Sequence, residues 1–143
     1  MVGRSVMLKR ALALSVGLLL GGLFMIGESR AAASGQTQTN SGGGVTIKVI
    51  YQNPKSAEDV RFQVALDTHS VDLDAYDLKA VSLLRDEAGK TYELTRVENK
   101  GSGHHRQVVL VFPRPSGEVK RLELVLKDIA GVKERSFRWD LSQ

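Results

Sequence analysis

The clearest structural pattern in the chain lies in residues 119–141, VKRLELVLKDIAGVKERSFRWDL. Its apolar side chains recur at every second position, which places them on one face of a β-strand and the charged side chains on the other. A turn around Gly131 separates two such runs, 119–127 and 135–141. The stretch therefore predicts two antiparallel strands joined by a short turn, each with one buried face.

The same alternation recurs in five shorter runs upstream, each ended by turn residues: 45–51, 60–66, 79–85, 91–98 and 106–112. Seven short strands without a helical period predict an all-β fold, a seven-stranded immunoglobulin-like antiparallel sandwich. The inward faces of two sheets would then form its core. We expect that core to contain four large side chains: Phe62, Phe112, Leu124 and Trp139. The one place where a helical turn competes with this pattern is 55–58, between the first two strands.

An N-terminal leader precedes these strands. Three basic residues near the start are followed by seventeen uncharged residues, 11–27, and then by three alanines ending at Ala33. This order predicts a signal peptide over 1–33, cleaved after Ala33. The alternative is an uncleaved helical anchor, although seventeen residues fall short of the roughly 20 needed to span a bilayer. Both alternatives predict export, to the periplasm, cell surface or extracellular space, with membrane contact only through residues 11–27.

The composition of residues 34–44, SGQTQTNSGGG, predicts a flexible linker between the leader and the folded part. We therefore expect three parts: the leader 1–33, the linker 34–44 and the β-sandwich 45–143. The leader holds four basic residues and one acidic residue, so most of the net charge of +4 belongs to it. The rest of the chain, with 16 basic and 15 acidic side chains, gives no reason to expect nucleic-acid binding.

The chain contains no cysteine. This excludes disulfides, zinc sites built from thiolates, a cysteine nucleophile and an acylated lipoprotein anchor. The core alone must therefore hold the exported domain together.

All three histidines fall in two connections between predicted strands. His69 lies in 67–77, and His104 and His105 lie in 99–105. Because successive strands alternate in direction, both connections should lie at one end of the sandwich, together with the turn 128–131. We call this end, made of 67–77, 99–105 and 128–131, the pole.

Imidazoles beside carboxylates suit copper or zinc among the divalent ions. The predicted metal-binding residues are His69, His104, His105, Asp67 and Asp72, with the aspartates orienting the rings. Adjacent residues of an extended chain point to opposite faces, so one of the two neighbouring histidines is expected to join the cluster. Two other interpretations stay open. Short polar side chains at the pole can instead bond to loop backbone, and the aspartates of 72–77 resemble calcium spacing without the EF-hand glycine and terminal glutamate.

Four segments of the chain together resemble a family of small exported bacterial immunoglobulin-like domains of unknown function. They are DTHSVDL (67–73), LLRDEAGKTY (83–92), GSGHHR (101–106) and DIAGVKERSFRWDL (128–141). The DTHS and GxGHHR elements of that family correspond here to His69, Ser70, His104 and His105. The resemblance implies that these residues are distinctive, but it implies no activity. The family pattern has an aromatic residue shortly before the glycines, where this chain has 96–99, RVEN.

These observations lead to two expected functions. The first is an exported cell-envelope binding domain that holds copper or zinc at the pole. The second is a non-catalytic structural or protein-interaction module with an envelope protein as partner, in which the histidines are hydrogen-bonding loop residues. We do not expect an enzyme. Ser70, His69 and nearby aspartates supply the residue types of a catalytic triad, but the chain has no nucleophile-elbow motif and no helix to form an oxyanion hole.

Overall fold

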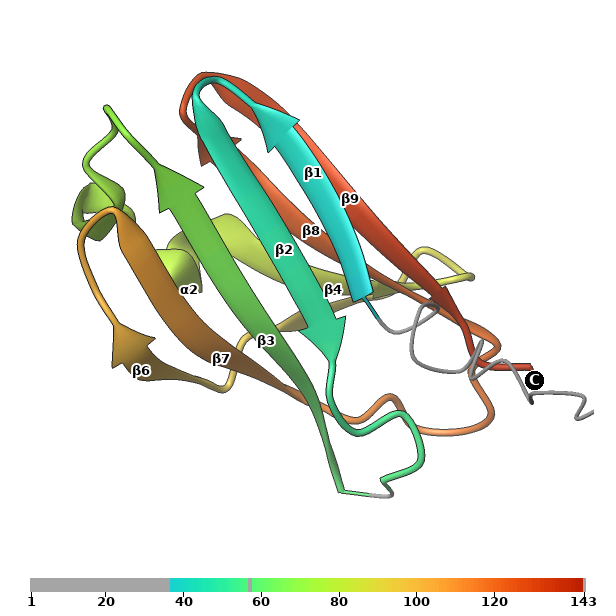
Figure 1. Ribbon diagram of the computed structural model, residues 1–143. Coiled ribbons are helices and arrows are strands. Elements are labelled where there is room, and N and C mark those ends of the chain that lie inside the picture. Colours follow the sequence, from blue (N-terminus) through green and yellow to red (C-terminus); the bar gives the residue numbers. More distant parts are fainter. Residues whose placement is uncertain (1–36, 57, 143) are drawn as a thin grey trace, which may run out of the picture.

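A computed structural model describes residues 37–56 and 58–142, which form two antiparallel β-sheets packed face to face (Figure 1). In chain order the strands are β1 Thr37–Gly42, β2 Val45–Tyr51, β3 Asp59–Thr68, β4 Ser82–Asp86, β5 Thr91–Glu93, β6 Arg96–Gly101, β7 His105–Pro113, β8 Arg121–Ile129 and β9 Val132–Asp140. A 3₁₀ turn, η1 (Leu73–Ala75), and one helical turn, α2 (Leu78–Val81), lie between β3 and β4. The first sheet has the order β1-β2-β3-β7-β6, and the second has β5-β4-β8-β9.

The core lies between the sheets and is built by the alternation seen in the sequence. Phe62, Phe112, Leu124 and Trp139 are all buried, which confirms the predicted core residues. The ring of Phe62 is the centre of an aromatic cluster, 4.8 Å from the ring of Trp139 and 5.0 Å from that of Tyr51. Each such side chain contributes about 1.5–3 kcal/mol when it leaves water, and ring contacts add to this.

The prediction of a flexible linker over 34–44 is wrong for residues 37–42. These residues form β1, which pairs with β2 from Thr37↔Ile50 to Gly42↔Val45. The composition is misleading because an edge strand can be held by backbone hydrogen bonds and polar side chains without any apolar face. The predicted leader and its helix, residues 1–33, lie outside the described residues, as do 34–36. Within 37–56 and 58–142, no helix is both long and apolar enough to cross a membrane.

The predicted strand over 91–98 is two strands in different sheets. β5 pairs with β4 in the second sheet, and β6 pairs with β7 in the first. The chain crosses between the sheets at Leu94, whose side chain is buried, and Thr95, whose N–H donates to Val111 O at 2.8 Å. Tyr92 and Leu94 are two positions apart, but the next apolar residue, Val97, follows after three, so the alternation shifts phase at this crossing. The prediction of a single strand overlooked that shift.

Two other segments also differ from the predicted pattern. The run 79–85 begins as the helical turn α2, because the Asp77 side chain caps it by accepting from Lys79 N. Near 55–58, the described residues show a hydrogen-bonded turn in which Ser56 N donates to Asn53 O at 3.0 Å.

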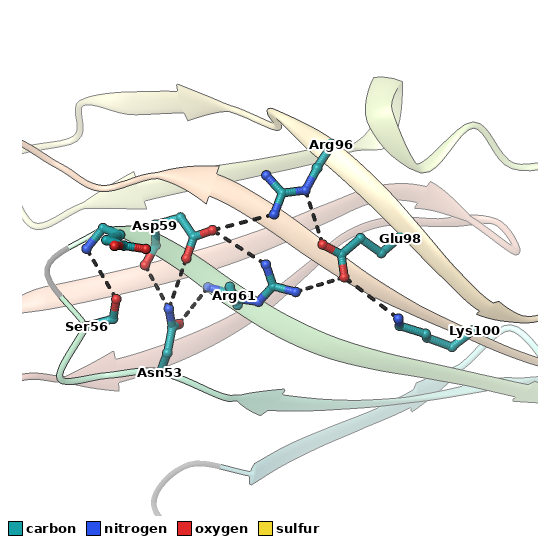
Figure 2. Close-up of polar contacts among 8 residues, drawn as sticks. Asn53, Ser56, Asp59, Arg61, Arg96, Glu98 and Lys100 are labelled. Carbon is teal, nitrogen blue, oxygen red and sulfur yellow. Dashed lines mark hydrogen bonds and ion pairs between the residues drawn. The ribbon is translucent and has the colours of Figure 1, made fainter.

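The outer side of the first sheet carries a layer of ion pairs (Figure 2). Arg61 of β3 donates to Glu98 of β6 at 2.8 Å, across the intervening strand β7. Arg96 donates to the same carboxylate at 3.1 Å, and the hydrogen bond from Arg61 is the main reason that the pKa of Glu98 is lowered. Beneath these side chains, Val109 and Val111 are 4% and 1% exposed although they face outward. The charged side chains therefore act as a cover over two valines, which matters more than the modest energy of exposed ion pairs.

Candidate functional site

The two histidine-bearing connections meet, which confirms the predicted pole. Thr68 N donates to His104 O at 3.0 Å, and Gly103 N donates to the Asp74 carboxylate at 3.0 Å. In Figure 1 the end of β3, the β6–β7 turn and the β8–β9 turn gather toward the same upper end of the sandwich. The physical reason is strand direction. β3, β6 and β8 all run toward this end, so the connections that follow them lie there.

Arg106 fastens one connection to the other. Its Nη1 donates to Leu73 O at 2.7 Å and to Tyr76 O at 2.9 Å, and its side chain is 12% exposed. The carbonyls belong to the first residue of the 3₁₀ turn η1 and to the residue that follows the turn. Leu73 O also accepts from Tyr76 N at 3.4 Å, so the guanidinium adds a shorter, charge-assisted hydrogen bond there. The conformation of 73–76 thus depends on a residue from the far side of the β6–β7 turn.

The β8–β9 turn joins the pole through Tyr76. Ala130 N donates to the Tyr76 hydroxyl at 2.9 Å. Ala130 has a φ of 52°, a left-handed conformation that is costly for a residue with a Cβ. The bond from its N–H to the phenol stabilises this turn and ties it to the β3–β4 connection.

The β1–β2 turn, residues 43–44, is a fourth connection at the pole. Thr68 Oγ1 donates to Gly44 O at 2.8 Å and accepts from Ser70 N and Val71 N at 3.2 Å. Gly43 has a φ of +60°, and a Cβ at that position would lie 2.0 Å from Ala130 O. All four connections at this end are therefore linked, with the β3–β4 connection in contact with each of the other three.

The histidine side chains do not converge. His105 Nδ1 lies 2.6 Å from Asp67 Oδ1, with the two side chains 72% and 49% exposed. This pair sits in register on the outer side of the first sheet. His69 and His104 are exposed, and His104 accepts from Thr68 N through its backbone carbonyl.

Of the five predicted metal-binding residues, the structure brings two together, His105 and Asp67. Asp72 instead caps η1, accepting from Asp74 N at 3.1 Å. No group of three or more His, Cys, Asp or Glu side chains that would hold a metal ion is found in the part of the chain that the structure describes. Metal binding at the pole stays a prediction. Asp67 is paired with His105, whereas Asp72, Asp74 and Asp77 accept hydrogen bonds from loop backbone.

A hollow of about 460 Å³ lies beside the pole, lined by Asp74, Asn99, Gly101, Ser102 and Arg106. Its two charged lining residues already hold loop backbone, Asp74 at Gly103 N and Arg106 at Leu73 O. The lining therefore consists mainly of groups that shape the loops.

Sequence reasoning missed Arg135, which lies beneath the pole. Arg135 is only 1% exposed, and this burial lowers the pKa of its guanidinium. Nη1 donates to Asn40 Oδ1 at 2.8 Å, and Nη2 donates to Gly42 O at 2.7 Å and to Ile129 O at 3.3 Å. The sequence did contain a sign that Arg135 is buried: it lies two positions before Phe137 and four before Trp139, on the same inward face of β9.

No protein-family model matches the chain, and no curated protein sequence matches it. Among solved structures, the chain is similar to a crystal structure of a DUF4426 family protein from Pseudomonas aeruginosa PAO1. The two are 15% identical, the match covers 72% of this chain and 93% of that chain, and the TM-score is 0.46.

Proposed function

We propose that the chain is an exported, non-catalytic binding module of the cell envelope that contacts a partner protein through its pole. The observation that carries this proposal is that four connections, drawn from both sheets, are held to one another by hydrogen bonds while His69, Ser70 and His104 remain exposed on them. A surface ordered in advance loses little conformational entropy on binding. Loops held on a rigid scaffold are where such domains usually carry their function.

The strand order supports an immunoglobulin-like interpretation of the sandwich. β2-β3-β7-β6 corresponds to the ABED sheet of that fold, and β4-β8-β9 corresponds to its CFG sheet. β5 then extends the second sheet beside β4, and β1 extends the first sheet beside β2. In variable domains of this architecture, the B–C and F–G loops at one end form the binding surface, and the pole contains the same two connections.

The direction of β1 supports an accessible pole. β1 ends at Gly42, next to the turn 43–44 at the pole, so Thr37 lies toward the opposite end of the sandwich. A leader retained as an anchor over 11–27 would therefore join the domain at the end away from the pole. Cleavage after Ala33 would leave the pole equally free, whether the protein acts in the periplasm, at the cell surface or outside the cell.

Site-specific photo-crosslinking tests this proposal. A photoreactive side chain replaces His69 or Ser102 at the pole, and Lys90 at the opposite end serves as the control, in the exported protein in its own cells. All three positions are exposed. We expect discrete crosslinked products from both pole positions and none from Lys90. Equal products from all three positions, or none from the pole, would contradict the proposal.

A copper or zinc site is the second candidate function, and one observation favours it. His105 Nδ1 is held by Asp67 Oδ1 at 2.6 Å on an accessible surface, which leaves Nε2 as the metal donor with the carboxylate orienting the ring. Calorimetric titration with Cu(II) or Zn(II) tests it. Binding that is lost in His105→Ala and kept in His69→Ala supports the site. Equal binding by both variants would show that any metal is held elsewhere.

A further inference from the structure

No buried apolar side chain of β1 fixes how this strand lines up with β2. Its sequence, TQTNSG, contains no apolar side chain, and none of its residues is buried. Register is normally set by a buried apolar face, and strands that are polar on both sides tend to slip. Even so, β1 pairs with β2 in one continuous register over six residues.

The hydrogen bonds that Arg135 donates to β1 can fix this register instead. It points inward from β9, and no carboxylate of the described residues lies within ion-pair distance of it. Two of its three acceptors, Asn40 Oδ1 and Gly42 O, belong to β1. A cation that is taken out of water needs such acceptors, because an uncompensated buried charge is strongly destabilising.

The acceptors are available only in the observed register. A slip of one residue turns Asn40 to the outer side of the sheet and removes it from the guanidinium. A slip of two residues puts either Gln38 or Gly42 in its place, a side chain of different length or none. Gln38 also depends on this register, because its side-chain amide donates to Arg138 O and accepts from Arg138 N at 3.0 Å.

We propose that Arg135 is a register lock for β1, a buried cation that selects this strand in this position and lowers the stability of the fold in return. Its Nε has no hydrogen-bond partner among the described residues, so the guanidinium is only partly compensated. Specifying a register is the best-attested use of a buried polar group. The lock also holds the pole, since β1 leads directly into the turn 43–44 that packs against Ala130 and Thr68.

The proposal is tested by replacing Arg135 and by removing its side-chain acceptor, Asn40. Arg135→Met keeps an unbranched side chain but removes the guanidinium and its charge. We expect it to melt at or above the wild-type Tm, while hydrogen-exchange protection of the β1 amides falls at least about tenfold and that of β8 is unchanged. Asn40→Ala leaves the cation without its one side-chain acceptor among the described residues and should lower Tm by roughly 10 °C or more. The double variant Asn40→Ala/Arg135→Met should recover most of that loss.

Arg138→Met is the matched control. It removes an arginine from the same strand whose side chain is exposed and paired with Glu123 at 2.7 Å, and it should change neither Tm nor β1 protection appreciably. The proposal is overturned if Arg135→Met fails to fold or melts well below wild type, since the cation would then be a stabilising contact. It is overturned equally if β1 keeps its full protection in that variant.

Discussion

Gly43→Ala should destabilise the domain by more than about 3 kcal/mol. The new Cβ would lie 2.0 Å from Ala130 O, a backbone atom that cannot move without distorting the β8–β9 turn. The backbone at this position also has a φ of +60°, which costs about 1–2 kcal/mol for any residue other than glycine. For a domain of this size, the combined effect corresponds to a fall in Tm of roughly 10–20 °C in a thermal unfolding experiment.

Gly89→Ala is the control for this prediction. Gly89 has a φ of +83°, but a Cβ there would meet nothing within 4 Å. Its replacement isolates the cost of backbone conformation, about 1 kcal/mol. If the two variants lose equal stability, the contact between the β1–β2 and β8–β9 turns is not as close as the structure shows.

Arg106→Ala should destabilise the domain by about 2–4 kcal/mol. The guanidinium is largely buried and donates to both Leu73 O and Tyr76 O, so its removal takes a charge-assisted hydrogen bond from each carbonyl and leaves Leu73 O only the 3.4 Å bond from Tyr76 N. Equilibrium unfolding in urea gives the free energy directly.

The comparison for this variant is Arg96→Ala. Arg96 makes two polar contacts as well, ion pairs with Asp59 and Glu98. Its side chain is 52% exposed, so its removal should cost only about 0–1 kcal/mol. A loss in Arg106→Ala no larger than that in Arg96→Ala would mean that the pole does not depend on this guanidinium.

Alternation of apolar residues was enough to predict most of the strands and the composition of the core. It works because the two faces of each central strand have different surroundings, as in β3, where every second residue is buried. It failed for β1, where both faces are polar and the partners are a neighbouring backbone and an arginine far along the chain. It also failed after Leu94, where the chain changes sheets, because the shift of apolar phase from Leu94 to Val97 was not taken as the end of a strand.

The position of the pole was predictable from topology, but its interactions were not. Counting alternating strands was sufficient to bring 67–77 and 99–105 together. The roles of individual residues depend on side-chain direction, which the sequence does not specify for loops. Asp72 was expected beside a histidine and instead caps a turn. The backbone acceptors of Arg106 and the backbone donor to the Tyr76 hydroxyl, which hold the pole together, could not be inferred from the sequence.

Amide hydrogen exchange on the wild-type domain, measured residue by residue by NMR, tests most directly whether the pole is one ordered surface. The three amides that join its connections are those of Thr68, Gly103 and Ala130, which donate to His104 O, Asp74 and the Tyr76 hydroxyl. We predict that all three exchange at least about tenfold more slowly than an unstructured chain, as ordered backbone does. Exchange of these amides at the rate of free loops would contradict the account, because the pole would then be a set of independent loops.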